Sequence, residues 1–252
     1  MNCDLNVILE SKGASAAAAL TWYNPAERIE LSGQVLSKWL SKVTAMITNE
    51  SEIGNGYEHL AVHLALPVHW RTVVWACGVW RAGGAAVLGA GPEVSRWQEE
   101  HPSASQAVLS VASQPEDLLP QAPVQALLPL PSLALRWPGP LPPLVLDGAA
   151  DLMGCPDVFP ATPAAPEQLA LTAVGGQGQA QSWTRGQLAA QAAPPSETIP
   201  GNPVLVHEQE PAPALLGCLR AWANGGRAVL VAPEADAALL TAVARQEGCA
   251  AA

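Results

Sequence analysis

Two hydrophobic periods organise the first half of the chain. Between residues 35 and 47, apolar side chains recur every three or four positions, which predicts an amphipathic helix that begins after Ser32 and ends near Glu50. Residues 59–66 alternate with a period of two, which predicts a strand. The same patterns predict a hairpin over 20–31, a helix over 70–80, a strand over 85–88, a helix over 92–100 and a strand over 107–111. This alternating order of strands and helices predicts parallel pairing with right-handed crossovers.

The middle of the chain is dense in proline. Residues 115–143 hold nine prolines, so we expect no regular element there. Over 144–159 we expect a short strand and a helix that carries Asp147 and Asp151, followed by a hinge-like linker at 160–166. The later elements expected are a strand over 169–174, a glycine turn at 175–178, a helix from Thr184, a strand over 204–207, a helix over 212–224, a strand over 228–231 and a helix over 234–246. The fold class is therefore α/β, with parallel sheets flanked by helices, in one sub-domain over 1–165 and a second over 166–252.

Composition and charge exclude several classes of partner. Hydrophobic residues make up 49% of the chain and charged residues 13%, which is typical of a folded protein. The net charge of −10 argues against nucleic acid and against an anionic membrane surface, because both attract basic proteins. The most apolar window, 71–91, contains Arg71 and Arg81, which favours a buried helix and strand over a membrane span.

Cysteine usage indicates a compartment. The five cysteines are scattered and form no C-x-x-C pair, which fits a reducing cytoplasm. The N-terminus has an alanine run without the basic segment and long apolar core of a signal peptide. We therefore expect a cytoplasmic protein.

The glycine turn is the main candidate for a ligand site. Gly175, Gly176 and Gly178 lie between an apolar strand and a helix, where backbone N–H groups can wrap around a phosphate. However, the turn contains no serine or threonine, and no lysine stands in it or just after it. A Rossmann dinucleotide site is disfavoured because Gln181 occupies the place of the third glycine in G-x-G-x-x-G. Two interpretations stay open, a weak nucleotide or phosphate site and a tight structural turn.

Four stretches, in this order, resemble the front of the adenylate-forming superfamily, which contains acyl-CoA synthetases, luciferases and peptide-synthetase adenylation domains. They are Leu20-Thr21-Trp22 with Glu30-Leu31-Ser32, residues 53–91, the glycine turn, and Val206-His207 with the Ala-Asn-Gly-Gly-Arg-Ala-Val-Leu run at 223–230. The resemblance implies the fold of the family's N-terminal sub-domains. It places Thr172, Gly175, Gly176 and Gly178 in the phosphate loop and His207 beside a ligand pocket, and it implies ATP or AMP as the cofactor.

The chain also departs from the family. The phosphate loop of the family ends Pro-Lys-Gly, whereas Gln181 stands near the lysine position here. The family's adenine-, magnesium- and ribose-binding parts and its catalytic lysine would come after residue 252. We therefore expect a truncated relative without catalytic residues of its own.

Three hypotheses about function follow. The first is a non-catalytic binding or interaction module, which acts as a homo-oligomer or beside another protein. The second is a protein that still binds a nucleotide or an acyl ligand weakly. The third is an adenylating enzyme that depends on a partner for its missing half. An open pocket around the glycine turn and His207 would favour a retained ligand, whereas a filled pocket with an apolar surface elsewhere would favour the interaction module.

Other polar residues receive structural interpretations. His59 and His63 are four apart, but on a strand this separates them by roughly 13 Å, too far to share one metal ion. We therefore expect no metal site. Asp147 and Asp151 are expected on the solvated face of a helix.

Overall fold

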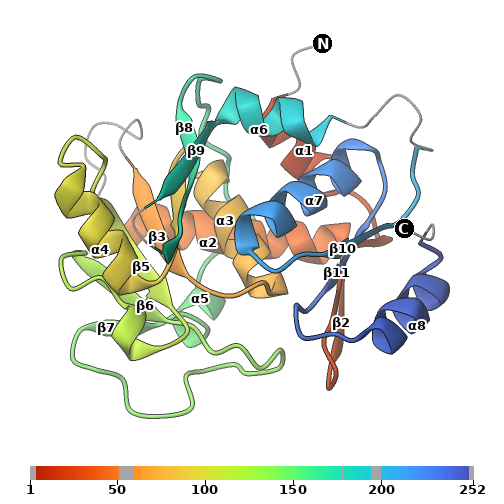
Figure 1. Ribbon diagram of the computed structural model, residues 1–252, viewed down its shortest axis with the longest axis horizontal. Helices are drawn as coiled ribbons and strands as arrows, with labels where there is room; N and C mark the ends of the chain where they lie inside the picture. The colour runs from red at the N-terminus through yellow and green to blue at the C-terminus, as the bar shows by residue number, and fades with distance from the viewer. Residues whose placement is uncertain (1–3, 51–59, 177–178, 194–199, 250–252) are drawn as a thin grey trace.

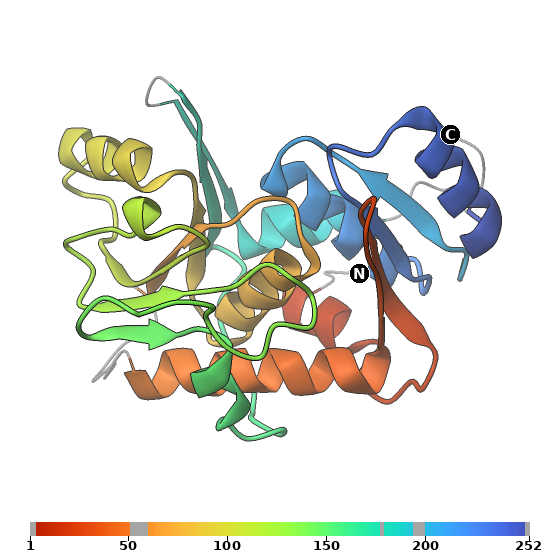
Figure 2. The ribbon, with the colours of Figure 1, turned by 90° about the horizontal axis from the view of Figure 1, so that it is seen from below.

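The computed structural model describes residues 4–50, 60–176, 179–193 and 200–249. Its strands form two sheets, and a layer of helices lies between them (Figure 1). Seen from below, α4 and α8 lie at opposite ends of the molecule, outside the two sheets (Figure 2). The predicted α/β class, with mostly parallel sheets flanked by helices, is confirmed.

The larger sheet has seven strands in the order β7-β6-β5-β3-β4-β8-β9. Their bounds are β3 (Ala61–Ala65), β4 (Ala85–Leu88), β5 (Ala107–Ala112), β6 (Val124–Leu127), β7 (Val145–Asp147), β8 (Leu169–Val174) and β9 (Ala180–Thr184). Neighbours pair in parallel except β8 and β9, which are antiparallel. All five residues of β3 are buried, since this central strand is covered on both faces. The predicted alternation across 59–66 therefore does not correspond to one solvated face.

The smaller sheet joins the two ends of the chain. Its four strands lie in the order β10-β11-β1-β2, with bounds β1 (Ala18–Tyr23), β2 (Arg28–Ser32), β10 (Val204–His207) and β11 (Ala228–Val231). The hairpin of β1 and β2 was predicted, and β1 also pairs in parallel with β11. Each sheet thus takes strands from both sides of the boundary expected at 165/166, so that boundary does not separate the two sheets.

The helices confirm most of the sequence-based expectations. Their bounds are α1 (Leu5–Glu10), α2 (Gly33–Glu50), α3 (Trp70–Arg81), α4 (Gly91–Glu100), α5 (Ala150–Met153), α6 (Arg185–Ala192), α7 (Pro211–Ala223) and α8 (Ala237–Glu247). Every residue of α3 is buried, because this helix lies in the central layer. A Cβ atom on Gly78 would lie 2.3 Å from Cγ1 of Val43, so α3 and α2 approach as closely as a glycine allows.

One expectation about the middle of the chain is wrong. The proline-rich segment 115–143 contains β6 and a short 3₁₀ helix at Pro115–Asp117. Proline removes a donor only at its own position, and the proline-free run after Pro123 is long enough to pair with β5 and β7. The segment 160–166, predicted as a linker, contains no helix or strand, and the Thr162 N–H donates to the Arg81 carbonyl at 2.7 Å.

The glycine turn also differs from the expectation. It connects β8 and β9 as an antiparallel hairpin, and α6 begins only after β9. Thr184 caps α6 through a capping box with Gln187, so the N-terminus of this helix is separated from the glycines by a whole strand. The strand-turn-helix phosphate cradle is therefore wrong in its geometry. None of the helices in the described part of the chain combines the length and apolar composition that a bilayer crossing requires.

Candidate functional site

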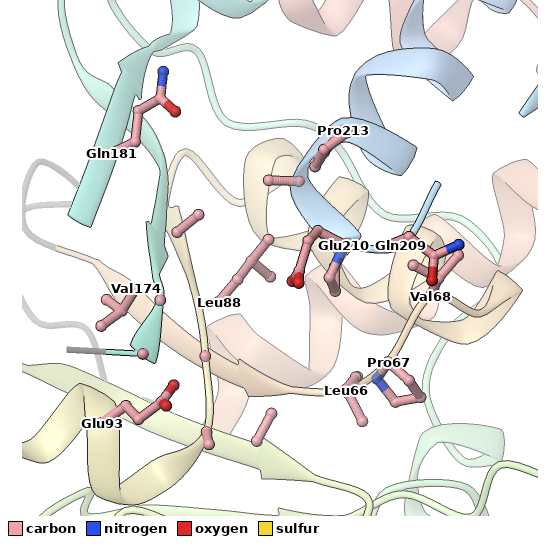
Figure 3. A pocket seen from close by; sticks show the side chains of 18 of the residues that line it. Leu66, Pro67, Val68, Leu88, Glu93, Val174, Gln181, Gln209, Glu210 and Pro213 are labelled. Atoms are coloured by element: carbon pink, nitrogen blue, oxygen red, sulfur yellow. The ribbon is translucent and has the colours of Figure 1, made fainter. Parts of the chain in front are cut away.

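A cavity of about 1010 Å³ lies at the carboxyl ends of the central strands of the larger sheet. It is bounded by the ends of β3, β4 and β8, by β9, and by the first turn of α7 (Figure 3). The carboxyl edge of a parallel sheet is where ligands of α/β proteins usually bind. This cavity is therefore the candidate functional site.

The inner wall of the cavity is apolar. Leu66 and Val68 come from the connection after β3, Leu88 and Val174 come from the ends of β4 and β8, and Leu216 comes from α7. All five side chains are less than 10% exposed, so they belong to the core as well as to the cavity. Such a wall suits the apolar body of an organic ligand.

Carboxylates, amides and Ser113 form the polar part of the wall. Glu93 comes from α4, Asp117 from the end of the 3₁₀ helix, and Glu210 immediately precedes α7. Glu93 and Glu210 lie on opposite sides of the cavity in Figure 3. The amide side chains are those of Gln179, Gln181 and Gln209. Lysine and arginine are absent from the described residues of the lining, so the site has a negative formal charge.

The glycines of the turn contribute backbone to the site. Gly175 and Gly176 line the cavity, and the Gly175 N–H donates to the Gln179 carbonyl at 2.9 Å. A Cβ atom on Gly176 would lie 3.5 Å from Oε1 of Glu93, so a carboxylate faces this turn. At the end of β4, Gly89 has a φ of +150°, and a Cβ there would lie 2.9 Å from the Val174 carbonyl oxygen. Only glycine fits this close approach of β4 and β8 without strain.

The structure separates the residues that the sequence grouped as a ligand region. Thr172 is fully buried, and its hydroxyl lies 3.0 Å from that of Ser182 across the hairpin. His207 is half-buried at the end of β10, and its Nε2 lies 3.4 Å from the carbonyl of Pro233, which does line the cavity. Gly178 lies outside the described residues. Of the five candidates, Gly175 and Gly176 therefore line the cavity, whereas Thr172 and His207 are not among its lining residues.

A buried histidine contacts Gly89, one of the residues that line the cavity. His63 is 0% exposed on β3, with Nε2 2.9 Å from the Gly89 carbonyl and Nδ1 2.9 Å from the Ser110 hydroxyl. Burial lowers the pKa of His63 to about 4, although the hydrogen bond to Gly89 opposes this shift. The imidazole is therefore neutral at pH 7, with Nε2–H donating to Gly89 and Nδ1 accepting from Ser110. His63 thus holds the end of β4 through Gly89. His59, the other histidine considered for a metal site, lies outside the described residues.

The two aspartates of the predicted helix act locally. Asp147 ends β7, and its Oδ1 accepts hydrogen bonds at 3.0 Å from the backbone N–H groups of Ala149 and Ala150 at the start of α5. Asp151 accepts a hydrogen bond from the Asp147 N–H at 2.8 Å. Both side chains therefore stabilise a turn, and Asp147 lies on a strand rather than on the helix.

The carboxylates of the cavity were missed by the sequence analysis. Glu93 follows the end of β4 by five positions, Asp117 follows β5 by five, and Glu210 follows β10 by three. Positions after the carboxyl ends of strands are where side chains of a parallel sheet converge. This signal was present in the sequence, but it needed the strand order to be informative.

The chain shares its fold with a class of known proteins. The arrangement of mostly parallel sheets and helices matches the N-terminal sub-domains of adenylate-forming enzymes. The acyl-CoA synthetase of Brucella canis superposes with a TM-score of 0.77 at 15% identity, over 97% of this chain and 46% of that chain. The fatty acyl CoA synthetase of Mycobacterium tuberculosis gives 0.70 at 13% identity, over 96% of this chain and 47% of that chain. The N-terminal subdomain of NpsA from Klebsiella oxytoca gives 0.65 at 14% identity, over 98% of this chain and 59% of that chain.

Sequence comparison gives a shorter match. The TIGR03089 family protein of Mycobacterium tuberculosis is 36% identical over 75 residues, which are 29% of this chain and 30% of that protein. No protein-family model matches the chain. The chain thus spans about half the length of the synthetases that it superposes on, and these similarities establish its fold.

Proposed function

We propose that the protein is a small-molecule-binding module with the N-terminal fold of adenylate-forming enzymes, and that the chain does not form adenylates by itself. The observation that carries this proposal is the open cavity of about 1010 Å³ beside the glycine turn. An open cavity supports a retained ligand over a purely structural module, in which side chains would fill the space.

The polar wall of the cavity argues against adenylate formation. This reaction concentrates negative charge at the α-phosphate of ATP and needs cationic groups placed there in advance. Glu93, Asp117 and Glu210 place like charge in the cavity instead. Gln181, which stands near the lysine position of the resembling enzymes, is an exposed neutral side chain on β9.

An exchange assay tests the absence of adenylation. The chain, incubated with ATP, magnesium, labelled pyrophosphate and butyrate, octanoate or benzoate, is expected to give no exchange above the protein-free control. Calorimetry is expected to show no saturable ATP binding below the millimolar range.

Replacing Gln181 by lysine is expected to strengthen ATP binding about tenfold, because it adds one cation beside the glycine turn. Gln191→Lys, on the exposed side of α6, is the matched control and should leave ATP binding unchanged.

Two other results would favour the alternative hypotheses. Micromolar ATP binding by the unmodified chain, lost in Gly176→Leu, would contradict the proposal and favour a working nucleotide site. Exchange that appears only after a second polypeptide is added would favour a partner-dependent enzyme.

A second role, self-association, is favoured by an apolar surface on another face. Leu133 and Leu135 are 82% and 69% exposed beside a smaller cavity of about 200 Å³ that Trp39 lines. Arg71 holds their segment in place, since its Nη2 donates to the Ala134 carbonyl at 2.8 Å. Exposed apolar side chains that gather around an apolar hollow are a feature of interaction surfaces.

Sedimentation velocity tests this second role. The unmodified chain is expected to form a dimer at micromolar concentration, and Leu133→Ser with Leu135→Ser is expected to shift it to the monomer. Val7→Ser removes an equally apolar side chain that is 61% exposed on α1, and it should leave the dimer intact. A monomer at all concentrations would exclude self-association.

A further inference from the structure

We propose that the cavity at the carboxyl edge of the larger sheet binds an organic cation, a molecule in which a protonated amine is attached to an apolar body. This inference rests on the proposed binding function and names the class of ligand for the same site. An organic cation differs in charge from the nucleotide ligand that the resemblance implied.

The charge of the cavity is the first observation. Glu93, Asp117 and Glu210 reach one cavity from three elements that are far apart in the sequence. The ion pairs of the described residues involve four other carboxylates, those of Glu10, Glu30, Asp157 and Glu247. The three cavity carboxylates are therefore not neutralised by an ion pair there. A concave wall of one charge sign focuses the electrostatic potential and raises the local concentration of the opposite charge.

The position of Glu93 is the second observation. Its Oε1 lies 3.5 Å from the point where a Cβ on Gly176 would be, so the space in front of the glycine turn already holds a carboxylate. An anion that approached the turn would meet this negative charge. An ammonium group would instead meet an acceptor, and it can donate up to three hydrogen bonds to carboxylate, amide and backbone oxygens.

The apolar wall is the third observation, and it excludes a bare metal ion as the best fit. Leu88 and Val174 are 4% and 5% exposed, and with Leu66, Val68 and Leu216 they supply apolar lining to the same cavity as the carboxylates. In Figure 3, Leu88 lies between Glu93 and Glu210. The cavity volume of about 1010 Å³ lies at the upper end of the range of organic ligand sites. An aliphatic or aromatic body would cover this wall while its amine meets the carboxylates.

Three probes of matched size and different charge test the inference. They are 2-phenylethylamine, 2-phenylethanol and 3-phenylpropanoate, each titrated by calorimetry at pH 7 and low ionic strength. The amine is expected to bind at least tenfold more tightly than the alcohol, and the acid is expected to bind most weakly. Added salt should weaken binding of the amine and leave binding of the alcohol unchanged.

A double variant that removes two carboxylate charges tests whether the cavity is the binding site. Glu93→Gln combined with Glu210→Gln is expected to weaken amine binding about tenfold and to leave binding of the alcohol as it was. Glu99→Gln removes one charge from the exposed side of the same helix, away from the cavity lining, and should change neither. Glutamine keeps the size of glutamate, so the variants preserve the shape of the site.

The outcomes separate the inference from the proposed function. Equal affinity for the three probes, or tightest binding of the acid, would overturn the cation inference while the binding function stands. No binding of any probe, together with no thermal shift at millimolar concentration, would overturn both.

Discussion

Replacing Trp80 by alanine is expected to lower the free energy of unfolding by about 3 to 5 kcal/mol, a large share of the stability of a single domain. Trp80 is 0% exposed on α3. Its indole N–H donates to the Ala170 carbonyl on β8 at 2.7 Å, and its own carbonyl accepts from Nη1 of Arg185 at 2.9 Å. Alanine would remove the ring and its hydrogen bond and would leave a cavity between the central helices and the larger sheet.

Urea unfolding followed by circular dichroism measures this loss. Trp80→Phe keeps most of the buried ring and removes the indole N–H, so we expect it to cost about 1 to 2 kcal/mol, well below the alanine variant. A loss below about 1 kcal/mol for the alanine variant would contradict the prediction, provided that the slope of the free energy of unfolding against urea concentration is unchanged. Such a result would show that the structure collapses around the smaller side chain.

Replacing Glu247 by glutamine is expected to destabilise the protein by about 2 kcal/mol at pH 7 and to release α8 from the smaller sheet. The Glu247 side chain is 3% exposed, and its oxygens lie 3.0 Å from Nη2 of Arg28 and 2.8 Å from Nη2 of Arg227. Its Oε1 also accepts a hydrogen bond from the Tyr23 hydroxyl. Because the two arginine side chains are 39% and 29% exposed, solvent screens part of each interaction, and the expected loss is set below that of a fully buried pair.

The same residue makes stability depend on pH. Burial alone would raise the pKa of Glu247, but the hydrogen bonds from Tyr23 and Arg28 and the charge of Arg227 outweigh burial and lower the pKa below its ordinary value of 4.5. The folded form therefore holds this proton less tightly than the unfolded chain. Its stabilising effect is complete above pH 4.5 and is lost as the pH falls through the lowered pKa.

Unfolding curves between pH 7 and pH 3 test this dependence. The difference in free energy of unfolding between the unmodified chain and Glu247→Gln should shrink as the pH falls below 4.5. Glu30→Gln, which removes a carboxylate that is 43% exposed and also pairs with Arg28, is the control and should cost less than about 1 kcal/mol. A difference that stays constant down to pH 3 would contradict the assignment.

Much of the fold could be predicted from the sequence because its signals are local. The stripe of apolar residues in 35–47 gives α2, and the bounds predicted for β4, β10 and β11 agree with the structure. The strand β6 was missed because the count of prolines over a long segment concealed a short proline-free run. The strand β9 was missed because it is an edge strand and its first three residues, 180–182, are exposed. Such residues show no alternation of apolar and polar side chains.

The candidate site could be predicted only in part. Gly175 and Gly176 were found because a glycine turn after an apolar strand is a recognisable motif, and both line the cavity. Thr172 and His207 were grouped with them through family resemblance, and neither is among the residues that line the cavity. The carboxylates that set the charge of the cavity lie on segments with no motif of their own.

The sequence by itself determined the order and type of most elements, since burial periodicity and turn residues depend on near neighbours in the chain. The tertiary structure decided that both sheets draw strands from both halves, because β1 pairs with β11 across more than two hundred residues. It also decided that Glu93, Asp117 and Glu210 share one cavity. Residues so far apart meet only through the spatial order of the strands, which hydrophobic periodicity does not encode.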